Sequence, residues 1–327
     1  MNFSKLIFFM MIIVSSIISL SSKNWMGIWM GMEMNLMFFI PMMSMSKNLK
    51  SSKSMMIYFL TQSIGSIIML FSLLMMLFSI YMSMINGMMK MMIMISLLLK
   101  MGAAPFHMWL PKMMFFMKWF ESSILLTWQK ITPIYFVSIL SPNKLIYISI
   151  AMSAMIGSIG GIKYSSIMMI MAYSSINHLS WILMMVINKM QWFKYFILYS
   201  FILMTSILFF NHYKIYFLNQ VNILMSIPEK LTFSSLMLSM GGLPPFLGFL
   251  PKWITIQSMI NSSLLYLMMV LIMMSLLTLF FYMRIILPFL MLNHPLNIYL
   301  YKTNSSTIFN FMLMLNLMFP LFLIFNF

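Results

Sequence analysis

Three lysines inside long apolar stretches are the residues of this sequence whose type and position could do chemistry. Lys100 follows the run ISLLL, Lys130 lies in ILLTWQKITPIYF, and Lys252 ends the segment GGLPPFLGFLPKW. A lysine at the centre of a membrane helix costs roughly 2.5–3.5 kcal/mol on insertion scales. Such an amine indicates either a path for protons or ions, or a structural kink from which the side chain reaches the interface.

Proline and glycine are expected to interrupt the helices that carry two of these lysines. Pro105 lies in LKMGAAPFHMWLPK, and the pair Pro244–Pro245 precedes Lys252. Proline removes a backbone donor and clashes with the preceding turn, so both helices should break at these prolines. Broken backbone survives at membrane depth only where protein or a wet cavity surrounds it.

The two interrupted segments resemble each other. PFHMWLPK (105–112) and PFLGFLPK (245–252) are identical at five of eight positions, with an offset of 140 residues. Paired interruptions in inverted halves of a chain are typical of transport paths. The register of this match aligns Lys252 with Lys112 rather than with Lys100.

One acid and one histidine could take part in the same chemistry. Glu33 is the single acid placed inside a predicted helix, and Lys100 is its expected partner, because a carboxylate at that depth takes up a proton or finds a cation. The alternative is a protonated glutamate bonded to a neighbouring helix. His178, in MAYSSINHLSWIL, could relay protons between wet sites, or it could be a core histidine satisfied by a serine. The other acids, Glu121 and Glu229, lie near span ends and are assigned to loops or interfaces.

Composition places the whole chain in a membrane. The 327 residues are 63% hydrophobic and 7% charged, with nineteen basic residues and three acids. The basic residues fall mostly one at a time between apolar runs and form no stripe interleaved with aromatics, so nucleic-acid binding is excluded. Fifty methionines indicate a mitochondrial code that reads an isoleucine codon as methionine.

Several kinds of site are excluded by what the sequence lacks. It has no cysteine, its four histidines lie far apart, and it contains no glycine-rich phosphate loop. Disulfides, thiol catalysis and thiolate metal sites are therefore excluded. We expect no metal, nicotinamide, flavin or iron–sulfur cluster to be bound by this chain.

Hydrophobic runs predict an all-α polytopic membrane protein of about eleven transmembrane helices, two of them broken, with no soluble domain. Residues 1–327 should form a single transmembrane domain, and the first apolar run is read as a retained helix rather than a cleaved signal. The predicted spans are 3–21, 25–45, 55–80, 86–110, 122–140, 144–163, 166–187, 192–212, 231–251, 255–289 and 307–326. Loops on the N-terminal side carry eleven basic residues, Arg284 included, against five on the other side, which predicts an N-terminus in the matrix.

Six stretches of this chain resemble one family, the antiporter-like subunit 2 of mitochondrial NADH:ubiquinone oxidoreductase (respiratory complex I), in its animal form. They occur in family order between about residues 25 and 260: WMGIWMGMEMNLMFFIP, YFLTQ, LKMGAAPFHMWLP, LLTWQK, MAYSSINHLSW and GGLPPFLGFLPKW. The chain departs from the family before YFLTQ, where many relatives carry an acid. It also departs at Pro111-Lys112, where many read PE.

The resemblance implies an inverted-repeat bundle that translocates protons in the mitochondrial inner membrane. It implies Glu33 and Lys100 as a coupled pair, Lys130 as the central lysine and Lys252 as the lysine of the second broken helix. NADH, FMN, iron–sulfur clusters and ubiquinone would be bound by other subunits. The implied partners are the other membrane-arm subunits, accessory subunits and lipids such as cardiolipin.

Two other functions remain as alternatives. A free-standing cation/proton antiporter shares the broken helices, but it would usually place more than one carboxylate in the membrane. A purely structural membrane spacer leaves the three buried lysines unexplained.

Overall fold

A computed structural model describes residues 3–45, 49–78, 83–222, 227–261, 264–291, 313–314 and 316–317. Within these residues the regular structure is helical, and the one β-bridge joins Ser166 to Phe217. The chain divides into two compact units, residues 1–149 and 150–327. The predicted eleventh span, 307–326, lies outside the described residues except at 313–314 and 316–317.

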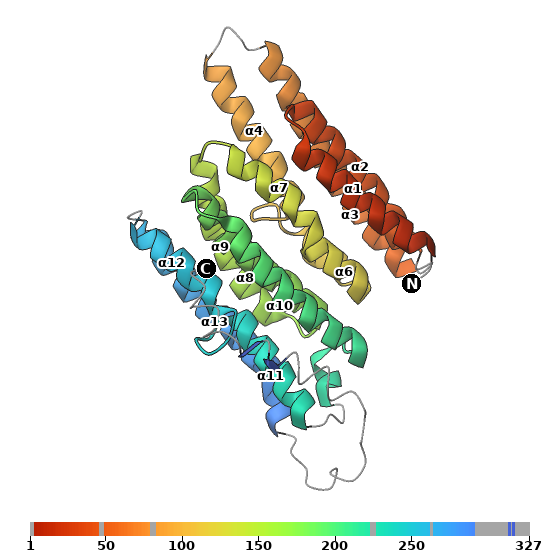
Figure 1. The fold of residues 1–327 in the computed structure, drawn as a ribbon, viewed down its shortest axis with the longest axis vertical. Helices are drawn as coiled ribbons and strands as arrows, with labels where there is room; N and C mark the ends of the chain where they lie inside the picture. Colours follow the sequence, from red (N-terminus) through yellow and green to blue (C-terminus); the bar gives the residue numbers. More distant parts are fainter. Residues whose placement is uncertain are drawn as a thin grey trace. The chain divides into compact units, whose positions relative to one another are not determined.

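The first unit is built from α1 to α7 and the start of α8. Its helices pack in sequence order, α1 on α2, α2 on α3 and α3 on α4, and α4 also packs on α7 (Figure 1). Their bounds are α1 Phe3–Ser21, α2 Trp25–Ser44, α3 Leu49–Phe78, α4 Ser83–Met101, α5 Trp109–Met114, α6 Trp119–Leu126, α7 Trp128–Ile139 and α8 Lys144–Lys163.

The second unit is arranged around α9, which is buried along nearly its whole length. α10, α12 and α13 all pack against α9, and α11 packs against α10 and α13. The bounds are α9 Ile167–Ile187, α10 Trp192–Tyr213, the 3-10 helix η2 Leu218–Asn222, α11 Ile227–Gly241, α12 Phe249–Asn261 and α13 Leu265–Met291.

Six helices in the described part of the chain are long and apolar enough to cross a membrane. They are α1, α3 over Leu49–Met76, α8, α9, α10 and α13 over Leu265–Pro288. The shorter helices α4–α5, α6–α7 and α11–α12 lie where three more spans are predicted, at 86–110, 122–140 and 231–251.

α4 and α11 end in the same backbone motif. Gly102 (φ 71°) and Gly242 (φ 77°) are left-handed, a conformation that glycine adopts without steric cost. After α4, the amide of Ala103 donates to the carbonyl of Leu98; after α11, Leu243 donates to Leu238. This six-to-one bond after a left-handed glycine is the Schellman motif, which ends a helix.

The two ends are separated by 140 residues, the offset of the matching sequence segments. Helix resumes only at Trp109 in the first unit and at Phe249 in the second. Pro105, Pro244 and Pro245 fall in these interruptions, and Pro111 and Pro251 lie in the first turns of α5 and α12. At both kinds of position the missing N–H group removes no helical hydrogen bond.

A third interruption lies inside the predicted span 122–140. α6 ends at Leu126 and α7 begins at Trp128, with Thr127 between them. The hydroxyl of Thr127 donates to the carbonyl of Ser123 at 2.7 Å. Pro133, inside α7, has no N–H to offer the carbonyl four residues earlier. Lys130 therefore lies in the first turn of a new helix rather than midway along a continuous one.

Other positions also differ from the sequence prediction. α12 crosses the boundary placed between the spans 231–251 and 255–289, and α13 begins only at Leu265. Glu121 and Glu229 are 1% and 3% exposed in the first turns of α6 and α11, where helix dipoles favour a carboxylate. The amine of Lys5 approaches Glu121 to 3.6 Å.

Arg284, which is expected in a loop on the N-terminal side, lies inside α13. Its guanidinium donates to the carbonyls of Gly161, Ile162 and Tyr164 at the end of α8. The last carbonyls of a helix have no partner within that helix, so a cation with several donors stabilises this end.

Candidate functional site

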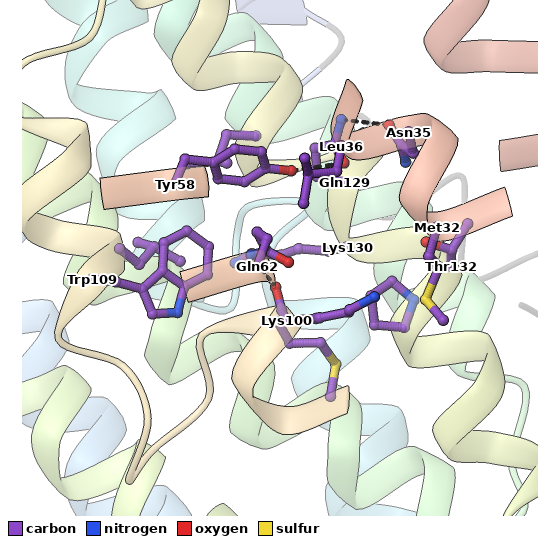
Figure 2. A pocket seen from close by; sticks show the side chains of 14 residues that line it. Met32, Asn35, Leu36, Tyr58, Gln62, Lys100, Trp109, Gln129, Lys130 and Thr132 are labelled. Atoms are coloured by element: carbon purple, nitrogen blue, oxygen red, sulfur yellow. Dashed lines mark hydrogen bonds between the residues drawn. The ribbon is translucent and has the colours of Figure 1, made fainter. Parts of the chain in front are cut away.

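Lys100 and Lys130 line one small cavity in the first unit, although thirty residues separate them in sequence (Figure 2). The cavity has a volume of about 30 Å³. A cavity needs roughly 10–15 Å³ to hold one water molecule, so this one has room for water between polar side chains. Its walls come from the six helices α2 to α7, and α4 contributes only its last two residues. The lining residues are Met32, Asn35, Leu36, Tyr58, Gln62, Lys100, Met101, Trp109, Leu110, Leu125, Gln129, Lys130, Thr132 and Pro133.

The two amines occupy opposite kinds of helix end. Lys100, 8% exposed, lies in the last turn of α4, where the negative end of the helix dipole favours a cation. Lys130, 2% exposed, lies in the first turn of α7, where the positive end of the dipole repels a cation. The same cavity therefore joins two amines that lie at oppositely polarised helix ends.

The carbonyls freed at the end of α4 find side-chain donors from this wall. The amide of Gln62 donates to the carbonyl of Lys100 at 3.3 Å, and the indole of Trp109 donates to the carbonyl of Leu99 at 3.1 Å. Buried carbonyls left without partners would be costly. Protein side chains thus satisfy two carbonyls at the end of α4.

A chain of neutral side chains forms another part of the wall. The amide of Gln129 donates to Oδ1 of Asn35 at 2.9 Å, and the hydroxyl of Tyr58 donates to Oε1 of Gln129 at 3.5 Å (Figure 2). These bonds connect α2, α3 and α7 beside Lys130. Asn35, Tyr58 and Gln62 are site residues that the sequence did not single out. The signal for them is their position in the two stretches that carry Glu33 and YFLTQ.

Glu33 is near this site but not on the cavity wall. Its side chain is half-buried on α2, next to the lining residue Met32, and its charge acts on Lys100 and on Tyr58. Its atom Oε1 is buried and makes no hydrogen bond among the described residues. No ion pair within 4.0 Å joins Glu33 to Lys100 among the described residues, so the two charged groups are not in direct contact.

Lys252 is held at the second interruption, inside the second unit. It is 5% exposed in the first turn of α12, and its amine donates to the carbonyl of Gly241 at 2.6 Å. That carbonyl is the last of α11, so Lys252 shares with Lys100 a position at the negative end of a helix that breaks. Lys112, its partner in the sequence match, is exposed.

His178 is 7% exposed on the central helix α9 of the second unit. Its Nδ1 lies 3.0 Å from the hydroxyl of Tyr195 on α10, so a tyrosine is one hydrogen-bond partner of this ring. The described residues contain no cluster of three or more histidines, cysteines or acids that could hold a metal ion.

Known proteins match this chain over most of its length. Residues 22–278 match the family model described as NADH:quinone oxidoreductase/Mrp antiporter, transmembrane. The NADH-ubiquinone oxidoreductase chain 2 of Anopheles gambiae is 43% identical over 318 residues, which cover 93% of each chain.

Solved structures share the fold at low sequence identity. A chain of respiratory complex I from Thermus thermophilus with bound aureothin is 15% identical, with a TM-score of 0.80 over 98% of this chain and 79% of that one. A chain of the Mrp complex from Dietzia is 14% identical, with a TM-score of 0.69 over 84% and 58%. The chain belongs to the NADH:quinone oxidoreductase/Mrp antiporter transmembrane family, and within it to the chain 2 proteins of NADH-ubiquinone oxidoreductase.

Proposed function

We propose that this chain is a core membrane-arm subunit of respiratory complex I that translocates protons across the mitochondrial inner membrane. NADH oxidation and ubiquinone reduction take place in other subunits, which bind FMN and the iron–sulfur clusters, and this chain holds no cofactor. The kinship with NADH-ubiquinone oxidoreductase chain 2 at 43% identity supports the assignment to the complex.

One observation carries the proton-translocating role: two buried amines, Lys100 and Lys130, face the same water-sized cavity from opposite helix ends. An amine exchanges a proton readily only if both of its protonation states are tolerated and a partner is within reach. We assign Lys130 as the central relay and Lys100 as the amine that holds a proton beside Glu33. One water molecule in the cavity would connect the two lysines.

We also assign His178 and Lys252 as proton-relaying residues within the second unit. Both are buried, polar and placed on helices that pack together, α9 and α12. Lys252 caps the end of α11, so a change in its protonation would alter the hydrogen bonding of the interruption itself. The structure of the second broken helix would therefore depend on whether Lys252 is protonated.

The assignment includes a topology and further partners. We propose eleven spans in a single transmembrane domain, related as two inverted halves, with the N-terminus in the matrix. The equivalent Schellman ends at Gly102 and Gly242 support the internal repeat. Lipids such as cardiolipin and accessory subunits would cover the exposed apolar faces of α1 and α3.

A free-standing cation/proton antiporter is the second candidate, because the family model includes Mrp antiporters. Native electrophoresis of inner membranes separates the two functions. We expect this chain to migrate with the large band that stains for NADH oxidation, and its migration in a separate, inactive band would favour the antiporter. Protease treatment of intact mitoplasts should leave the N-terminus uncut; cleavage there from the outer face would contradict the orientation.

A further inference from the structure

His178 is held by two tyrosines that come from successive turns of α10. The Nδ1 atom of His178 lies 3.0 Å from the hydroxyl of Tyr195, which is 1% exposed. One turn further, the ring centre of Tyr199 lies 4.6 Å from that of the imidazole, with a tilt of 36°. The imidazole therefore meets a hydroxyl group at one atom and an aromatic ring beside its face.

A phenol suits a histidine that changes its protonation state. The hydroxyl oxygen of tyrosine can accept from Nδ1–H, a group that both the imidazolium and the Nδ1–H tautomer of the neutral imidazole carry. This hydrogen bond is therefore kept when Nε2 gains or loses its proton. The hydrogen bond at one ring nitrogen also decides which nitrogen exchanges protons with other groups.

We propose that Tyr195 is the positioning residue of His178: it holds Nδ1 in both protonation states and thereby assigns proton exchange to Nε2. This inference rests on the proposed function, in which His178 relays protons. Tyr199 presents its ring to the imidazole, and the side chain that interacts with its hydroxyl is Ser175. The two tyrosines thus differ in how they contact His178: Tyr195 does so through its hydroxyl, and Tyr199 through its ring.

The difference supplies a matched pair of variants in the assembled complex. Tyr195→Phe should lower protons pumped per NADH by roughly three- to tenfold, the range that follows from losing one net hydrogen bond. Its solvent deuterium isotope effect on pumping should rise, because proton transfer becomes slower. Tyr199→Phe, at similar burial on the same helix, should assemble and pump as the native complex does. Equal losses in both variants, or none in Tyr195→Phe, would overturn the positioning role.

A double variant tests whether Tyr195 acts through His178. In a His178→Asn complex, adding Tyr195→Phe should cause no further loss of pumping, since no imidazole remains to be positioned. This comparison also holds if the single Tyr195→Phe variant does not assemble. Full pumping by His178→Asn would remove the relay role of His178 itself, whereas reduced pumping by His178→Asn and normal pumping by Tyr195→Phe would refute the positioning role alone.

Discussion

The substitution Gly242→Ala tests how closely the second interruption is fitted to Lys252. Gly242 is left-handed at φ 77°, and a Cβ atom there would lie 2.7 Å from Cδ, 2.9 Å from Cε and 2.8 Å from Nζ of Lys252. An alanine would therefore strain the backbone and displace the amine from the carbonyl of Gly241.

The expected cost has two parts. A non-glycine residue in the left-handed region costs about 1–2 kcal/mol. Loss of a hydrogen bond from a charged group costs about 1.5–3 kcal/mol. We therefore expect Gly242→Ala to destabilise the chain by roughly 2.5–5 kcal/mol, and to reduce pumping further because Lys252 leaves its position.

Two other glycines serve as controls. Gly102→Ala has the same backbone strain (φ 71°), but its Cβ would meet Leu110 and Trp109 rather than a lysine, so it should cost only the first part. Gly87 has no atom within 4 Å of an added Cβ inside α4, so Gly87→Ala should be neutral or stabilising. The assay is the temperature at which the purified complex loses NADH-driven pumping. If Gly242→Ala matches Gly87→Ala, the fit of Lys252 against Gly242 is wrong.

Two further substitutions test the packing around the proposed path. Arg284→Lys should lower the thermal midpoint of the complex by the equivalent of about 1–3 kcal/mol. The reason is that one ammonium group cannot replace a guanidinium that donates to three carbonyls. An unchanged midpoint would contradict the role of Arg284 as a cap on the end of α8. Asn35→Leu should cost about 1–3 kcal/mol by leaving the half-buried amide of Gln129 without its acceptor, and the double variant Asn35→Leu/Gln129→Leu should cost less than the sum of the single changes. Strict additivity in thermal stability would show that the two amides do not act as a pair.

The sequence located those features that follow from local chemistry. A lysine among leucines is costly in a membrane, so Lys100 was recognised from its neighbours alone. Gly102 and Gly242 mark the two helix ends because they permit the left-handed backbone that a Schellman end requires. The interruption at Thr127 was missed, since Pro133 lies six residues later and a single proline more often bends a helix than divides it.

Other parts of the site depend on packing between helices, which periodicity does not specify. Asn35 and Gln129 are neutral residues with a weak insertion signal, and their pairing arises only because α2 and α7 approach each other. The sequence match aligned Lys252 with Lys112, but Lys252 is buried and Lys112 is exposed. Equivalent backbone positions in the two units thus carry different side-chain environments.

The measurement that tests the central claim most directly is the number of protons pumped per NADH by a Lys130→Met complex. Methionine keeps the apolar bulk of the lysine and removes the titrating amine, so the complex should assemble, because loss of a buried charge should not harm folding. Pumping should fall sharply, and it should also fall in Lys130→Arg, where the guanidinium stays protonated. Normal assembly with full pumping per NADH in Lys130→Met would show that Lys130 is only a structural charge.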